Sequence, residues 1–216
     1  MKKQILTVKV FAFVFIMQIF MFEAEAKKKQ PYLVIDTLIL NTMDKKTFDV
    51  EEFEKNKEGS SWRYIEKDGT SIRAFVGSTG YYYVEEEPPP NPKLYQIYRE
   101  YYLSGRIKKV CLELRSIPVS IQKEYDEEGN LIKEINWDED YGKFDYNKVM
   151  LFLHKKGHIN IETGKGRDDL GLAYKKKENL WNVTILPSEN NGMLGYYYYL
   201  DGNSGKVKKS GRVRQE

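Results

Sequence analysis

Cysteine is nearly absent from this chain, with Cys111 the only one among 216 residues. A single cysteine cannot form a disulfide within the chain, so the stability of the fold must come from its apolar core. Cys111 lies in the stretch VCLEL, where Val110, Leu112 and Leu114 can face one way while Cys111 and Glu113 face the other. This alternation predicts a strand with a half-buried thiol, and we favour that structural role over a nucleophile.

Histidine is also scarce, with only His154 and His158 in the sequence. Two histidines four residues apart on one helix could bind a metal ion. Here Gly157 stands between them and is expected to end the helix, and no glutamate or cysteine follows in ligand register. We therefore interpret them as solvated histidines at a helix end, and we expect neither a metal nor another cofactor.

The sequence lacks an excess of either charge, since 35 basic residues face 32 acidic ones and the formal net charge is +3. Charges of both signs in similar number indicate a solvated surface and argue against a nucleic-acid-binding protein.

Motifs that would indicate an enzyme are lacking as well. The basic, glycine-rich stretch GKGRDDLG, residues 164–171, does not have the spacing of a phosphate-binding loop, and we expect a surface loop there. The stretch DGNSG, residues 201–205, begins like a calcium loop, but Arg212 stands at the twelfth position, where an EF-hand needs glutamate. A hairpin turn is the better interpretation. Carboxylate pairs such as Asp168 and Asp169 are expected by chance in a chain with 32 acidic residues. We predict a protein that is not an enzyme.

One long apolar run is present, at the N-terminus. Lysines in the first nine residues precede an almost wholly apolar stretch, residues 10–22, and then the small-x-small site formed by Ala24 and Ala26. This order is typical of a secretory signal peptide cleaved after Ala26. The apolar run has 13 residues, fewer than the roughly 20 that a spanning helix needs, so an uncleaved anchor is the second choice. We expect an exported protein, in the periplasm or outside the cell.

Aromatic residues are abundant, with 17 tyrosines that include runs at residues 81–83 and 196–199. Tyrosine favours strands because its ring packs on one side and its hydroxyl reaches water. In the first half of the chain we predict a buried strand at 32–42, a short helix at 47–57 capped by Thr47 or Asp49, a hairpin at 61–76 turning at Asp68 and Gly69, and a strand at 81–84.

The stretch EEEPPPNPK, residues 85–93, contains three glutamates and four prolines. Such a segment is expected to form neither a helix nor an interior strand, and we predict an extended linker and the main domain boundary here. After the linker, strands are expected at about 94–103, 106–115, 119–125 and 130–137, with glycine-containing turns between the members of each pair.

Two of these hairpins repeat one pattern at a distance of 24 residues. Tyrosine, glycine, an apolar residue and lysine recur in the order Tyr101, Gly105, Ile107, Lys109 and again Tyr125, Gly129, Leu131, Lys133. The glycine supplies the positive φ of a tight turn, and the tyrosine can pack across from the apolar residue. The pattern resembles the variant class of MORN-type repeats. That resemblance implies a binding or scaffold role in a secreted or antitoxin-like bacterial protein, and contact with membranes is a further property of the family.

The stretch DYNKVMLFLHKKG, residues 145–157, predicts a helix that Asp145 caps and Gly157 ends, with an apolar stripe facing the core. A strand, a loop, a strand, a turn and a strand are expected to follow. The arrangement resembles the PepSY domain of exported bacterial proteins, on the residues Trp181, Val183, Asp201, Gly205, Lys206 and Val207. It implies binding to, or inhibition of, protein partners in the envelope and carries no catalytic residues.

We therefore predict an α+β fold, mainly antiparallel sheet with one or two short helices packed on it. The expected parts are a signal peptide at 1–26, a small lobe at 27–84, the linker at 85–93, the repeat meander at 94–142 and a helix-plus-sheet unit at 143–216. The expected function is to bind another protein, a toxin or an envelope protein, as an immunity or inhibitor protein does. The alternative is a scaffold that binds cell-wall polymer or lipid. Large rings make good interface anchors, and the candidates are Trp137, Tyr141, Tyr197 and Tyr199.

Overall fold

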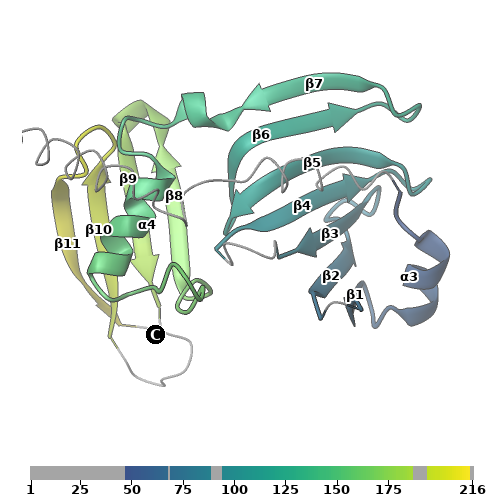
Figure 1. Ribbon diagram of the computed structural model, residues 1–216, viewed down its shortest axis with the longest axis horizontal. Helices are drawn as coiled ribbons and strands as arrows, with labels where there is room; N and C mark the ends of the chain where they lie inside the picture. The colour runs from purple at the N-terminus through teal and green to yellow at the C-terminus, as the bar shows by residue number, and fades with distance from the viewer. Residues whose placement is uncertain (1–46, 68, 89–93, 187–193, 215–216) are drawn as a thin grey trace, which may run out of the picture. The chain divides into compact units, whose positions relative to one another are not determined.

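The structure is a computed structural model that describes residues 47–67, 69–88, 94–186 and 194–214 (Figure 1). Two antiparallel sheets, one of seven strands and one of four, make up most of this part of the chain. Two short α-helices, α3 (Val50–Asn56) and α4 (Tyr146–Lys155), and two 3-10 helices, Trp137–Asp140 and Lys176–Glu178, complete it. The predicted class, an α+β fold made mainly of antiparallel sheet, is confirmed. The expected signal segment and the strand at 32–42 lie outside the described residues.

The seven-stranded sheet is a meander in which each strand pairs with the next one along the chain. Its strands are β1 (Ser61–Ile65), β2 (Ser71–Val76), β3 (Tyr83–Glu87), β4 (Gln96–Tyr101), β5 (Ile107–Leu114), β6 (Ile117–Tyr125) and β7 (Leu131–Asn136). The hairpin predicted at 61–76 is β1–β2, and the four strands predicted between residues 94 and 137 are β4 to β7.

The 24-residue repeat has a common geometry. Tyr101 pairs with Ile107, and Tyr125 pairs with Leu131, as the sequence pattern predicts. Each pair is preceded by the same register shift, which lies between Glu100 and Tyr101 in the first hairpin and between Glu124 and Tyr125 in the second. The turn glycines have φ of 79° at Gly105 and 91° at Gly129, a conformation that favours glycine. The two hairpins are therefore copies of one unit, bulge included.

The prediction that residues 85–87 belong to a linker outside the sheet is wrong. Glu85 and Glu86 pair with β2 on one side and β4 on the other, and Glu87 pairs with Ile97 of β4. The seven-stranded sheet therefore continues from residues before the predicted boundary to residues after it. Residues 89–93 of the predicted linker lie outside the described part.

Helix α3 packs against one face of this sheet. Asp49 caps it by accepting a hydrogen bond from the backbone N–H of Glu52, at 2.9 Å, as predicted for one of the two candidate caps. The rings of Phe48 and Phe53 are buried against Tyr83, and the Phe48 N–H donates to the carbonyl of Gly105 at 2.8 Å. Phe48, just before the helix, therefore joins this segment to the first repeat turn.

The four-stranded sheet has the order β11-β10-β9-β8. Its strands are β8 (Leu170–Lys175), β9 (Leu180–Ile185), β10 (Leu194–Asp201) and β11 (Val207–Arg214). The predicted helix is α4, capped at Asp145 and followed by Gly157 with a φ of 77°. Strand β8 was not predicted, because its first two residues belong to the glycine-rich stretch 164–171, for which a surface loop was expected.

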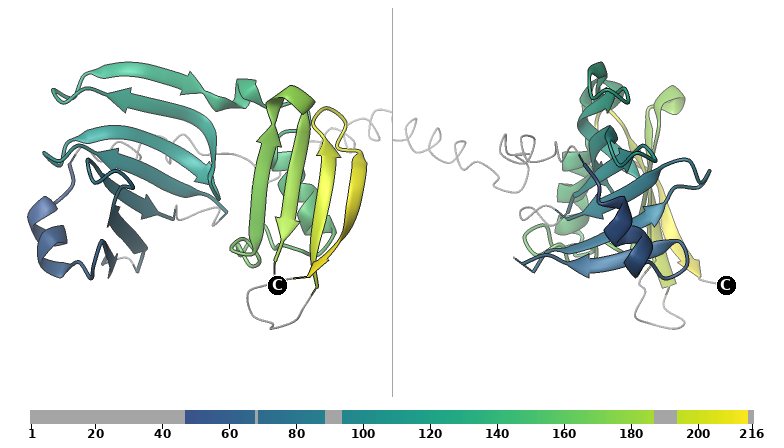
Figure 2. Two further views of the ribbon diagram at one scale, coloured as in Figure 1. Left: turned by 180° about the vertical axis from the view of Figure 1, so that it is seen from behind. Right: turned by 90° about the vertical axis from the view of Figure 1, so that its right-hand side faces the viewer.

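Helix α4 covers one face of this sheet (Figures 1 and 2). Val149, Met150 and Leu153 of the helix are fully buried, as are Trp181 of β9 and Leu200 of β10. The Trp181 indole N–H donates to the carbonyl of Phe144 at 2.7 Å, so the core retains no unpaired polar group at this ring.

Candidate functional site

The three hairpin turns β2–β3, β4–β5 and β6–β7 lie at the same end of the seven-stranded sheet, because successive turns of a meander alternate between its two ends. Side chains tie these turns together. The Tyr102 hydroxyl donates to the carbonyl of Tyr125 at 2.9 Å, and the Arg106 guanidinium donates to the carbonyl of Glu127 at 2.8 Å. The Lys108 ammonium lies 4.8 Å from the ring centroid of Tyr82. We call residues 77–82, 102–106 and 126–132 together the hairpin edge.

The hairpin edge exposes large apolar side chains. Tyr81 is 77% exposed, Leu103 52%, Leu131 52% and Ile132 62%. Within the described residues the structure exposes six large apolar side chains of this kind, and four of them belong to the hairpin edge. Scattered apolar residues on a surface need no explanation, whereas a group on adjoining turns indicates an interaction surface.

A groove with a volume of about 340 Å³ adjoins the hairpin edge. Its lining is mostly polar and comes from both copies of the repeat: Glu100, Tyr102, Lys108, Lys109, Gln122, Glu124, Tyr125 and Ile132.

The polar contacts of the groove also recur between the copies. The Tyr98 hydroxyl donates to Glu100 at 3.1 Å, and Gln122, 24 residues after Tyr98, donates to Glu124 at 2.7 Å. Glu100 forms ion pairs with Lys108 and Lys109, while the Glu124 carboxylate lies 3.9 Å from the Lys133 ammonium. Because these charges are already paired, the groove can accept a polar surface without leaving a charge uncompensated.

The two parts of the described chain carry opposite charge. Residues 47–142 hold 20 acidic and 13 basic residues, a formal charge of −7, whereas residues 143–216 hold 8 acidic and 14 basic ones, a formal charge of +6. Glu127 and Glu128 are exposed at the β6–β7 turn, beside the apolar side chains of the hairpin edge. Residues 1–46 add a formal charge of +4, so the overall balance of +3 conceals an acidic part at 47–142 and a basic C-terminal part.

The four predicted anchor residues do not form one surface. Trp137 is partly buried and donates from its indole N–H to Gln122, a groove residue, at 3.1 Å. Tyr141 belongs to an aromatic cluster, stacked on Trp181 at a centroid distance of 5.2 Å, with its hydroxyl donating to the carbonyl of Pro118. Tyr197 and Tyr199 lie side by side on β10, with ring centroids 5.6 Å apart. The expected cleavage residues Ala24 and Ala26 lie outside the described part.

Neither histidine is simply solvated at a helix end. The His154 ring nitrogen lies 3.2 Å from the carbonyl of Ile159, although its side chain is exposed as expected. The His158 ring packs against the rings of Tyr196 and Tyr198 and lies 2.9 Å from the Tyr198 hydroxyl. Burial, with a smaller contribution from Lys156, lowers the pKa of His158.

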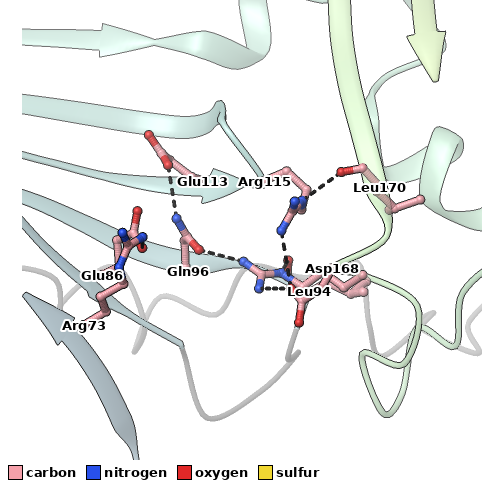
Figure 3. Close-up of polar contacts among 9 residues, drawn as sticks. Arg73, Glu86, Leu94, Gln96, Glu113, Arg115, Asp168 and Leu170 are labelled. Atoms are coloured by element: carbon pink, nitrogen blue, oxygen red, sulfur yellow. Dashed lines mark hydrogen bonds and ion pairs between the residues drawn. The ribbon is translucent and has the colours of Figure 1, made fainter. Parts of the chain in front are cut away.

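A polar cluster around Glu113 was not anticipated from the sequence (Figure 3). Gln96 donates to the Glu113 carboxylate at 3.3 Å, and Arg167 donates to Gln96 at 2.8 Å and to the carbonyl of Leu94 at 2.8 Å. Arg115 donates to the carbonyl of Leu170 at 2.9 Å. Burial raises the pKa of Glu113 to about 7, and the hydrogen bond from Gln96 opposes this shift. These contacts link β4 and β5 to the segment before β8.

A second buried network surrounds Glu85, which is fully buried. Its carboxylate accepts hydrogen bonds from the hydroxyls of Tyr64 at 2.7 Å and Tyr101 at 2.8 Å, and from Arg99 at 3.3 Å. Arg99 also donates to Glu87 at 2.5 Å. The residues come from three strands, β1, β3 and β4, and no local sequence signal joins them.

Comparisons of the chain with protein-family models, with curated proteins and with solved structures found no match. Among the described residues, no helix is both long and apolar enough to cross a membrane. In the same part of the chain, no group of three or more histidine, cysteine, aspartate or glutamate side chains is arranged to hold a metal ion.

The hairpin edge was not predicted from the sequence. A signal was nonetheless present, because Leu103 stands inside the turn of the first repeat, where polar residues are usual, and Ile132 follows the second turn at the position that Lys108 holds in the first repeat.

Proposed function

We propose that this chain is an exported binding protein of the bacterial envelope that holds another protein at its hairpin edge and neutralises it, as an immunity protein does. The observation that carries the proposal is the set of four exposed apolar side chains on three turns that are tied together. Covering these side chains with a partner removes them from water, which favours association. The hydrogen bonds between the turns hold this surface in shape before the partner arrives, which reduces the entropy lost on binding.

The negative charge of residues 47–142 indicates what kind of partner the hairpin edge would bind. Glu127 and Glu128 stand beside the apolar residues, and residues 47–142 have a formal charge of −7. A partner with an apolar centre and a basic rim would complement this surface. Charge of this kind accelerates the encounter and selects the partner, while the apolar contacts supply most of the affinity.

Sequence features are in keeping with this role. The order of residues 1–26 is typical of an export signal. The resemblance of the two hairpins to MORN-type repeats implies a binding role, and the resemblance of the C-terminal part to the PepSY domain implies partners in the envelope. A partner-binding protein needs neither cofactor nor catalytic residues.

The test is a pull-down with the full-length protein as bait against envelope extract and against the purified products of neighbouring genes. The variants Leu103→Glu and Ile132→Glu place a charge at positions that are 52% and 62% exposed, so folding is expected to be retained. Ile65→Glu is the matched control, because Ile65 is 72% exposed but belongs to the β1–β2 hairpin at the other end of the sheet.

We expect one stoichiometric protein partner, whose affinity falls by at least about tenfold in Leu103→Glu and Ile132→Glu and stays unchanged in Ile65→Glu. Added salt should slow the association of a basic partner. A partner that binds all three variants equally would refute the role of the hairpin edge. Retention on cell-wall or membrane material, with no protein partner, would favour the scaffold function instead.

A further inference from the structure

The four-stranded sheet has a face that α4 does not cover. Side chains alternate along its strands, so that Trp181, Val183 and Ile185 of β9 are buried on the helix side while Asn182 and Thr184 point the other way. Figure 2 shows β8 to β11 from this open side, with α4 behind them. On β10 the open face carries Tyr197 and Tyr199, which are two of the predicted anchor residues and are partly exposed.

Two rows of residues cross this open face from β11 to β8. In one row Lys209 pairs with Tyr199, Tyr199 with Asn182, and Asn182 with Ala173. In the other row Gly211 pairs with Tyr197, Tyr197 with Thr184, and Thr184 with Gly171. Each row therefore contains one aromatic ring, one side chain that can form hydrogen bonds, and a small residue on the edge strand β8.

The ring of Tyr197 lies against the backbone of β11. A Cβ added at Gly211 would come within 2.7 to 2.9 Å of three atoms at the outer end of this ring, so only glycine leaves room for it. Such a ring over a glycine stabilises the strand pair by itself. It also leaves the other side of the ring turned away from the sheet, next to the ring of Tyr199.

Beside the two rings, the surface towards β8 is low and polar. Gly171 and Ala173 are exposed and carry little or no side chain, while Asn182 and Thr184 supply an amide and a hydroxyl. A ridge of rings beside a low polar surface suits a ligand that has an apolar face and polar edges. A pyranose sugar has this character, because its ring C–H groups can pack on the electron-rich face of tyrosine while its hydroxyls form hydrogen bonds.

The charge of the open face favours an anionic ligand. The Lys209 ammonium lies 5.9 Å from the ring centroids of both Tyr197 and Tyr199. Lys175 is exposed on the same face of β8, where its ammonium lies 3.6 Å from the Glu178 carboxylate. The acidic residue at the end of β10, Asp201, is engaged by Ser204 and by Lys208 at 3.3 Å. Residues 143–216 as a whole have a formal charge of +6.

We propose that this open face binds an anionic pyranose polysaccharide. Sugar rings stack on Tyr197 and Tyr199, their hydroxyls bond to Asn182 and Thr184, and an acidic group of the polymer lies near Lys209. The site is separate in sequence and in strands from the hairpin edge, so it adds to the proposed function and does not depend on it.

The test is affinity electrophoresis of the full-length protein in native gels that contain alginate, a polyuronate of pyranose rings, or dextran, a neutral pyranose polymer. We expect alginate to retard the protein and dextran to retard it less. Tyr199→Ala should weaken retardation by alginate about tenfold, whereas Tyr199→Phe, which keeps the ring, should change it little. Asn182→Ala should weaken it without touching either ring, and Lys209→Ala should reduce the preference for alginate.

Leu103→Glu, which changes the hairpin edge, is the control and should bind alginate as the unchanged protein does. Loss of polysaccharide binding at the open face and loss of protein binding at the hairpin edge are thus measured in separate experiments. Circular dichroism confirms that each variant is folded. If alginate does not retard the protein, or if retardation is the same in Tyr199→Ala and Asn182→Ala as in the unchanged protein, the proposal is overturned.

Discussion

The Glu85 carboxylate and the Arg99 guanidinium lie 3.3 Å apart on neighbouring strands, with side chains that are 0% and 2% exposed. The tyrosine hydroxyls of Tyr64 and Tyr101 complete the set of donors around the carboxylate. This arrangement explains how an acidic strand can lie inside the seven-stranded sheet, because each buried charge has a partner of opposite sign and hydrogen bonds besides.

Removing one member of this network should destabilise the protein strongly. We expect Arg99→Met to lower the free energy of unfolding by about 3–5 kcal/mol, because Glu85 would remain buried without its cation. Urea denaturation followed by circular dichroism measures the change. The control is Arg73→Met, since Arg73 is 48% exposed and forms an ion pair with Glu86 at 3.3 Å on the sheet surface. That pair is expected to contribute less than about 1 kcal/mol, and equal losses in the two variants would contradict the role assigned to Arg99.

The two repeat turns should respond differently to the same substitution. At Gly105 the φ of 79° disfavours alanine, and an added Cβ would lie 2.6 Å from the carbonyl oxygen of Phe48. At Gly129 the φ is 91° and nothing lies within 4 Å of the added atom. We expect Gly129→Ala to cost about 1–2 kcal/mol of stability, from backbone strain alone, and Gly105→Ala to cost more because Phe48 must move.

Urea denaturation of the two variants, side by side, checks this expectation. The comparison is internal, since both glycines occupy the same position in copies of one hairpin. Equal destabilisation would show that contact with Phe48 does not constrain the first turn.

The repeats and their turns could be predicted from the sequence because the signals are local. Tyrosine, glycine and the apolar residue stand within six positions of one another, and the pairs Tyr101 with Ile107 and Tyr125 with Leu131 follow from a short turn. The cap at Asp145 and the end of α4 before Gly157 are local in the same sense. Short-range rules were sufficient for the two repeat turns and for both ends of α4.

Glu85 and the hairpin edge could not be predicted because their partners are distant. Three glutamates before prolines indicate a solvated segment until Arg99, 14 residues later, is placed beside Glu85. The hairpin edge joins turns from residues 77 to 132, and its exposed apolar side chains look ordinary one at a time. The predicted anchors were chosen for ring size, and Tyr141 lies in an aromatic cluster because Trp181 and Tyr174 pack against it.

Cys111 should be unreactive in the folded protein. It is 1% exposed, and burial raises the pKa of its thiol to about 12, so almost no thiolate forms at neutral pH. We expect Ellman's reagent at pH 8 to label the native protein far more slowly than the urea-unfolded protein, which should release one equivalent at once. Rapid labelling of the native state would show that β5 opens readily or that the thiol is accessible.

The stability of the protein should depend on pH through Glu113. Burial raises its pKa to about 7 in the folded state, against 4.5 for an unperturbed glutamate. Between these values the folded state retains a proton that the unfolded state has released, so the contribution of Glu113 to stability is greatest below pH 4.5 and falls as pH rises towards 7. The slope is at most about 1.4 kcal/mol per pH unit.

The variant Glu113→Gln keeps the shape of the side chain, remains neutral and can still accept a hydrogen bond from Gln96, so its stability should not fall in this way. The measurement is the difference in unfolding free energy between the two proteins from pH 4 to 8, in which groups common to both cancel. The difference should shift in favour of Glu113→Gln with rising pH and level off above pH 7. A difference that stays constant over this range would show that Glu113 ionises in the folded protein as it does in water.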